Sequence, residues 1–95
     1  PTPGHTPGHT SLVVSSQGQT AVIIGDAFMS PMDVAHPDWV STWDWDAEIV
    51  RQTRTSLGER IQRDNALIAS AHLPNPGLGH ILVGEGGRSW QALPA

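Results

Sequence analysis

The chain begins with a doubled Thr-Pro-Gly-His unit, and this repeat constrains the local fold more than any other segment. The stretch from Thr2 to Thr10 reads TPGHTPGHT. Its prolines lack a backbone N–H and its glycines permit tight bends, so the stretch cannot form a helix. His5 and His9 are four residues apart, but without a helix their side chains need not point the same way. We therefore expect a loop in which the two histidines have different roles.

Apolar runs separated by turn residues predict a mixed α/β fold for the chain. Residues 11–16 and 20–24 are rich in β-branched side chains and flank a Gln-Gly-Gln turn, which predicts a β-hairpin. Residues 27–43 show no periodicity, and we expect a long loop there. Residues 66–70 predict a buried strand, and residues 80–83 and 89–93 predict two more short strands.

One long helix is expected between the hairpin and the buried strand. Asp44 or Asp46 is the expected N-terminal cap, and Asp64-Asn65 is the expected end. The arginines of this helix are expected to form a solvated face. The opposite face carries residues at helical spacing, namely Ala47, Val50, Thr53 or Arg54, Leu57 and Ile61.

Composition excludes several classes of function. The formal net charge is -4 and there is no lysine, which argues against a nucleic-acid partner. There is no cysteine, so disulfides, thiolate metal sites and a cysteine nucleophile are excluded. No apolar run is long enough to span a bilayer, and no membrane partner is expected. Five histidines remain as an ample supply of metal ligands.

Three expected strand ends each carry one side chain that can bind a metal. His9 precedes the first strand, Asp26 follows the second, and His72 follows the buried strand at residues 66–70. Each has a structural alternative, because Asp26 can shape a turn and the histidines can bond to the backbone. Three such positions in one chain predict a metal site more strongly than any one of them alone.

These segments, in order, resemble a known superfamily. TPGHTPGHTSLVV, IIGDAF and IASAHLPNPGLGHI are similar to the C-terminal half of metallo-β-lactamase-fold hydrolases. SAHLPNPGLGHI and HPDWVSTWDWDAEIVRQTR resemble methyl parathion hydrolase-like and acyl-homoserine lactonase-like members most. The resemblance covers essentially all of residues 1–95. It implies the C-terminal half of a single αβ/βα sandwich domain with a binuclear metal site at one sheet edge.

The resemblance also implies the site residues and the reaction. His9 matches a ligand of the first metal, Asp26 a carboxylate that bridges both metals, and His72 a ligand of the second, with His5 expected to shape the loop. Two divalent ions, zinc or alternatively manganese, iron or cobalt, would hold a hydroxide. That hydroxide would attack an ester, lactone or phosphotriester, so a small-molecule substrate is expected, and Asp26 would also orient the nucleophile.

One departure from the superfamily pattern keeps other functions open. The motif His-x-His-x-Asp-His, which supplies the remaining ligands in the superfamily, is absent from these residues. We therefore expect either a fragment of a longer enzyme, inactive alone, or a non-catalytic binding or scaffold protein of the same fold. A mononuclear iron oxygenase of that fold is a further alternative.

Two more side chains are candidates near the site. His80 is expected to support a ligand or contact substrate, although a purely structural role in its strand is the simpler interpretation. Trp39, with Trp43 and Trp45, could line an apolar substrate pocket or a homodimer contact, or could pack the helix onto the sheet. The sequence fixes no compartment, with the cytoplasm slightly favoured.

Overall fold

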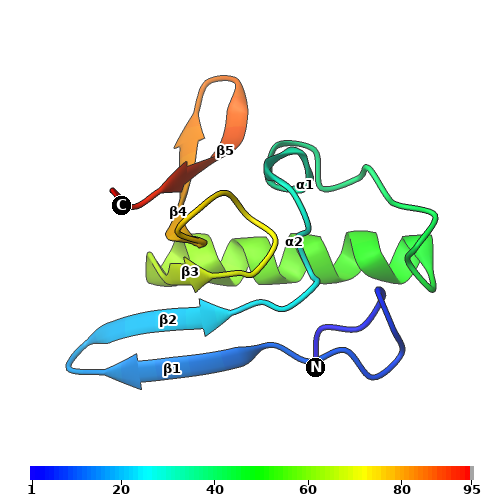
Figure 1. The fold of residues 1–95 in the computed structure, drawn as a ribbon, viewed down its shortest axis with the longest axis horizontal. Helices are drawn as coiled ribbons and strands as arrows, with labels where there is room; N and C mark the ends of the chain where they lie inside the picture. The colour runs from blue at the N-terminus through cyan, green and yellow to red at the C-terminus, as the bar shows by residue number, and fades with distance from the viewer. Residues whose placement is uncertain (95) are drawn as a thin grey trace.

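The computed structural model describes residues 1–94 and contains five strands and two helices (Figure 1). In chain order the elements are β1 (Leu12–Ser16), β2 (Gln19–Ile23), α1 (Pro31–Ala35), α2 (Ala47–Asp64), β3 (Leu67–Ala69), β4 (Leu78–Gly84) and β5 (Gly87–Ala92). The fold class is α/β, as the sequence predicts. None of the helices formed by residues 1–94 has both the length and the apolar character that crossing a membrane requires.

The five strands form one mixed sheet in the order β1-β2-β3-β4-β5. The predicted hairpin is confirmed, since β1 and β2 pair antiparallel with Val13 opposite Val22. β2 and β3 pair parallel, with Val22 opposite Ile68. A parallel pair needs a crossover connection, and α1 and α2 lie in that connection. Two antiparallel pairs, β3 with β4 and β4 with β5, complete the sheet.

The predicted long helix is α2, and its two ends are capped as the sequence indicates. The Asp46 carboxylate accepts a hydrogen bond from the Ile49 N–H at 3.1 Å. Asn65 closes the helix in the left-handed conformation with φ 48°, which asparagine tolerates better than most residues. Leu57 and Ile61 of α2 are buried in the core, as expected.

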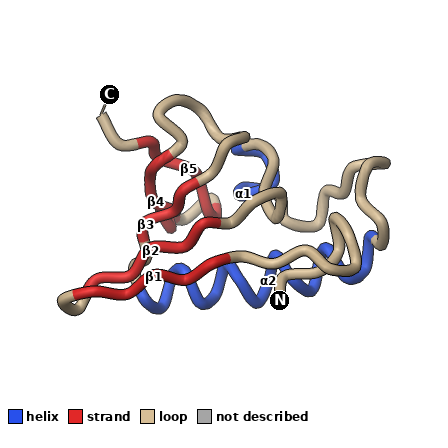
Figure 2. Tube along the Cα trace, turned by 60° about the horizontal axis from the view of Figure 1, so that its bottom comes forward, coloured by secondary structure: helices blue, strands red, loops and turns tan. Residues whose placement is uncertain are grey.

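The core lies between α2 and one face of the sheet (Figure 2). Val22, Ile24 and Ile68 are almost completely buried there. Side chains alternate between the two faces of a strand, so neighbours in sequence point the opposite way. The opposite sheet face carries apolar side chains that stay exposed, including Leu12 (59%) and Ile23 (46%). The sheet is therefore apolar on both faces but covered on one.

The structure corrects one expectation about residues 27–43 and, of the two alternatives Thr53 and Arg54, buries Arg54 on the inner face of α2. The expected loop at 27–43 contains the short helix α1, which has Pro31 in its first turn. Proline is favoured at that position because the missing N–H has no intrahelical partner there. Arg54 is not solvated with the other helix arginines, because its side chain is only 1% exposed. Its position on the buried face of α2 places it under the loop that precedes the helix.

Candidate metal centre

Three segments that are far apart in the sequence meet at one edge of the sheet. Asp26 follows β2 and His72 follows β3, and the ends of adjacent parallel strands lie at the same edge. His5 reaches the same place from the loop before β1. The Asp26 carboxylate lies between the two imidazoles, with Oδ2 3.1 Å from Nε2 of His5 and Oδ1 in contact with Nε2 of His72. This side-chain cluster is the candidate site.

The His5 imidazole is held on its far side by a second carboxylate. Its Nδ1 lies 3.1 Å from Oδ1 of Asp44, whose side chain is only 1% exposed. The other carboxylate oxygen of Asp44 accepts a hydrogen bond from the Ser41 N–H at 3.1 Å. His5 therefore has one nitrogen toward a buried acceptor and the other toward Asp26.

His9 is engaged by the main chain at both ring nitrogens. Its Nε2 lies 2.9 Å from the Asp26 backbone nitrogen, which can only donate, so Nε2 accepts this hydrogen bond. Its Nδ1 lies 2.9 Å from the Thr2 carbonyl oxygen, which can only accept, so Nδ1 carries the proton. Both nitrogens of the His9 ring therefore have hydrogen-bond partners in the main chain. His9 fastens the N-terminal loop to the backbone of Asp26.

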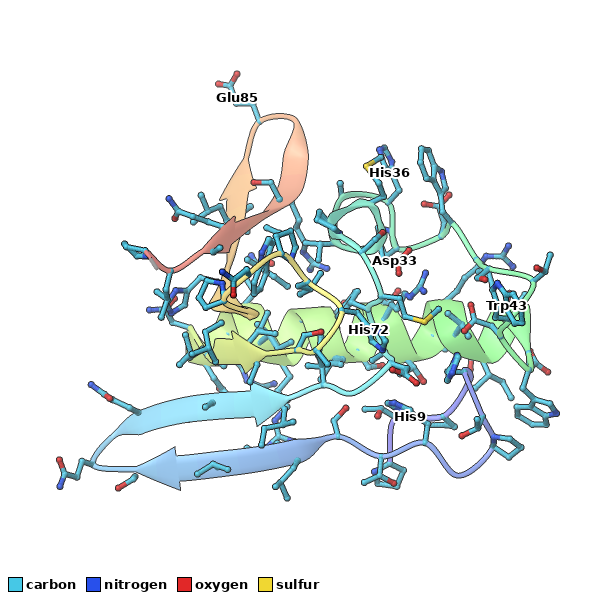
Figure 3. The ribbon with its side chains drawn as sticks, viewed as in Figure 1. His9, Asp33, His36, Trp43, His72 and Glu85 are labelled. Atoms are coloured by element: carbon cyan, nitrogen blue, oxygen red, sulfur yellow. The ribbon has the colours of Figure 1, made fainter. Side chains whose placement is uncertain are left out.

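The structure places the two histidines of the repeat differently from the expected arrangement. The sequence analysis assigned the ligand role to His9 and the loop role to His5. In the structure His5 faces the Asp26 carboxylate, whereas His9 contacts only its backbone. Figure 3 shows His72 and His9 near the end of β2, with His36 distant from them on the α1 side. The His5 and His9 side chains point in different directions because Pro and Gly bend the loop between the two Thr-Pro-Gly-His units.

The start of α2 supports the loop that carries His5. The Gly4 carbonyl accepts hydrogen bonds from the N–H groups of Trp45 (2.9 Å) and Asp46 (3.1 Å). The Thr53 hydroxyl donates to the Pro3 carbonyl at 2.6 Å. A Cβ added at Gly4, whose φ is +134°, would lie 2.7 Å from the backbone nitrogen of Val50. Only glycine allows the loop to lie this close to the helix.

Arg54 fixes the segment that follows Asp26. Its guanidinium donates to the carbonyl oxygens of Ala27 (3.0 Å) and Trp39, and it pairs with the Asp33 carboxylate at 3.2 Å. Asp33 in turn accepts the Met29 N–H at 2.8 Å. A buried arginine with this many acceptors is fully paired, which explains why burial is tolerated. Its place on the apolar face at helical spacing was the sequence signal for this role.

The other two candidates lie away from the carboxylate cluster. His80 on β4 lines a surface hollow of about 570 Å³ with residues that include Thr20, Asn65 and Leu67, at the end of α2 remote from its first turn. Trp39 is 52% exposed and stacks on His36, with ring centroids 3.9 Å apart. The structure brings neither His80 nor Trp39 into contact with Asp26. Asp44, which the sequence suggested only as a helix cap, is the residue that joins the cluster instead.

The donor chemistry of the cluster suits a divalent metal ion, although the cluster is not a closed cage. Two imidazoles and a carboxylate are common ligands of zinc and of neighbouring transition metals. Within residues 1–94, however, no three histidine, aspartate or glutamate side chains are arranged as a ready metal site. Asp26 bonds directly to both imidazoles, which brings the donors closer together than coordination of an ion between them requires.

Comparisons with solved structures give clear relatives for this arrangement. No protein-family model matches the chain, and a search of curated proteins finds no match. A solved structure of AidC, described as a dizinc quorum-quenching lactonase in complex with a homoserine product, matches 99% of the chain at 32% identity and a TM-score of 0.88. A hydrolase of the beta lactamase superfamily, AbOPH, matches 99% of the chain at 31% identity and a TM-score of 0.90.

A third structure extends the likeness of fold. A probable metal-dependent hydrolase from Staphylococcus aureus matches 99% of the chain at 20% identity, with a TM-score of 0.73. The chain covers 32%, 33% and 35% of these three proteins respectively, so it spans about a third of their length. Over this third, the chain shares the fold of metallo-β-lactamase superfamily hydrolases.

Proposed function

We propose that the protein is a metal-dependent hydrolase to whose metal centre this chain contributes His5, Asp26 and His72. The observation that carries the proposal is one carboxylate placed between the Nε2 atoms of two imidazoles from separate loops. His9, the ligand expected from the sequence, is replaced by His5 because both nitrogens of His9 bond to the main chain. The dizinc lactonase among the solved relatives supports zinc as the metal.

The residues of this chain would have different roles in such a metal centre. Asp26 offers one oxygen toward each histidine, as a carboxylate shared by two ions would. Bound zinc supplies Lewis acidity and lowers the pKa of water to about 7, so no nucleophilic side chain is needed. His9 Nε2 accepts the Asp26 backbone N–H and so fixes the position of the Asp26 main chain. We propose esters, lactones or phosphotriesters as the substrate class.

The test measures the metal content of the full-length protein and its turnover of three chromogenic or titratable substrates. We expect zinc in the purified protein and turnover of at least one aryl ester, N-acyl homoserine lactone or phosphotriester. The variants His5→Ala and His72→Ala should each lower kcat/KM by roughly 100-fold or more, because even partners of metal ligands contribute about 10–100-fold. His36→Ala is the control, since His36 contacts Trp39 rather than Asp26.

The outcomes separate the candidate functions. Zinc binding without turnover of any substrate class would favour the non-catalytic binding protein. Bound iron with oxygen-dependent turnover would favour the oxygenase. A larger loss for His9→Ala than for His5→Ala would restore the ligand assignment expected from the sequence. Protein that binds no divalent metal would refute the proposal.

A further inference from the structure

We propose that Asp44 is a positioning residue that sets the protonation of His5 and so directs its Nε2 lone pair to the metal. This inference rests on the proposed function, because it concerns how the proposed ligand His5 is prepared. The sequence suggested Asp44 only as a helix cap, but the cap of α2 is Asp46. The buried carboxylate of Asp44 instead contacts the Ser41 N–H of its own loop and the His5 ring.

The geometry gives each oxygen of Asp44 a separate partner. Oδ2 accepts from the Ser41 N–H at 3.1 Å, and Oδ1 lies 3.1 Å from Nδ1 of His5. A carboxylate at this position can only accept, so Nδ1 of a neutral His5 carries the proton and donates it. The remaining nitrogen, Nε2, lies 3.1 Å from Oδ2 of Asp26, and the proposed metal ion would bind Nε2 in place of this direct contact.

Burial makes the constraint strong. The Asp44 side chain is 1% exposed and the His5 side chain is 21% exposed, so water competes little for this hydrogen bond. The main chain adds to it, because the Trp45 N–H donates to the His5 carbonyl at 3.1 Å as well as to Gly4. Residues 44–45 therefore hold both the side chain and the backbone of His5 in place.

An asparagine at position 44 would reverse the preference for the protonated nitrogen. Asparagine has one acceptor oxygen, and the Ser41 N–H, a fixed donor, requires it. The amide NH₂ would then face Nδ1 of His5, and a donor at that place favours an unprotonated Nδ1 with the proton on Nε2. A protonated Nε2 cannot bind zinc. The substitution changes almost no volume, so it tests hydrogen bonding rather than packing.

The experiment measures Zn²⁺ affinity of the full-length protein by competition with a chelator. We expect Asp44→Asn to weaken binding by about 10–100-fold, the range found for partners of metal-binding histidines. Asp44→Ser, whose hydroxyl can still accept the Ser41 N–H, should weaken binding to a similar extent and provides a second variant if the first folds poorly. Asp46→Asn is the matched control, because asparagine also caps helices and the Asp46 carboxylate accepts the Ile49 N–H rather than a proton of His5.

Two further readouts distinguish positioning from general destabilisation. In the His5→Ala background, Asp44→Asn should have no additional effect on affinity, because the partner through which it acts is gone. In the zinc-loaded wild-type protein, nitrogen NMR should show His5 protonated at Nδ1. The inference about Asp44 would be wrong if Asp44→Asn and wild type bound zinc equally well. It would also be wrong if Asp44→Asn caused the same loss of zinc affinity in the His5→Ala background. Either result would leave the proposed function standing. A wild-type protein without zinc affinity would overturn the proposed function and this inference with it.

Discussion

The two glycines of the repeat provide a direct test of the loop geometry, because the same substitution should have opposite results at each. A Cβ at Gly4 would lie 2.7 Å from the backbone nitrogen and 2.8 Å from Cα of Val50, and these atoms cannot rotate away. A Cβ at Gly8 would meet nothing within 4 Å. Gly4→Ala should therefore displace the loop, whereas Gly8→Ala should not.

The size of the Gly4→Ala effect follows from these distances. Ordinary carbon contacts lie at about 3.5–4.0 Å, so relieving 2.7 Å requires the loop to move by roughly 1 Å. Holding alanine at φ +134° adds strain of about 1–3 kcal/mol. A misplacement of about 1 Å can lower activity by about 100-fold. At Gly8, loss of freedom in the unfolded chain should leave stability unchanged or raised by up to about 1 kcal/mol.

The assay is kcat/KM and Zn²⁺ affinity of both variants in the full-length protein, with urea unfolding to record stability. We expect Gly4→Ala to lose activity by about 100-fold and Gly8→Ala to stay within about twofold of wild type. Equal behaviour of the two variants would refute the reasoning, because it would mean that contact of the loop with α2 does not place His5.

Three further predictions concern the parts of the fold that support the site. Arg54→Met should lower the free energy of unfolding, measured in urea, by about 3–5 kcal/mol, because it leaves Asp33 and two carbonyls without their buried donor; an unchanged midpoint would contradict this. Asn65→Ala should cost about 0.5–1 kcal/mol and Asn65→Gly should not, since φ is 48° at this cap; equal unfolding curves would contradict it. A protein of residues 1–95 alone should self-associate in sedimentation experiments through the apolar sheet face, and serine at Leu12 and Ile23 should reduce association; a monomer that melts cooperatively would argue against it.

The elements with a clear pattern were predictable from the sequence. Runs of β-branched residues on both sides of Gly18 predicted the hairpin, and the spacing of Val50, Leu57 and Ile61 predicted the buried face of α2. The edge at which Asp26 and His72 meet was also predictable, because both follow apolar strands. In each case one local property, periodicity or a strand end, decides the outcome.

The directions of loop side chains were not predictable in the same way. Spacing could not decide between His5 and His9, because their directions depend on contacts with Asp44 and with the Asp26 backbone. The short helix α1 was missed because residues 27–43 show no periodicity, although Pro31 suits the first turn of a helix.

The contacts of Arg54 were not predictable for a related reason. Helical spacing left Thr53 or Arg54 on the apolar face, and the main-chain acceptors of the Arg54 guanidinium lie 15–27 residues away in the sequence. Contacts at such separation leave no periodic trace in the sequence. The same holds for Asp44, which is 39 residues from the histidine it contacts.

The way in which Arg54 holds its loop has a consequence for how this protein can vary in evolution. The guanidinium binds the carbonyl oxygens of Ala27 and Trp39, and every amino acid has such an oxygen. These two contacts therefore tolerate changes of side chain at positions 27 and 39, whereas the Ser41 hydroxyl accepts the Trp43 N–H within the same loop. Asp44 has no such freedom, because its own carboxylate makes the contact with His5. Residues 37–43 and the neighbouring Asp44 thus differ in how much sequence change their contacts allow.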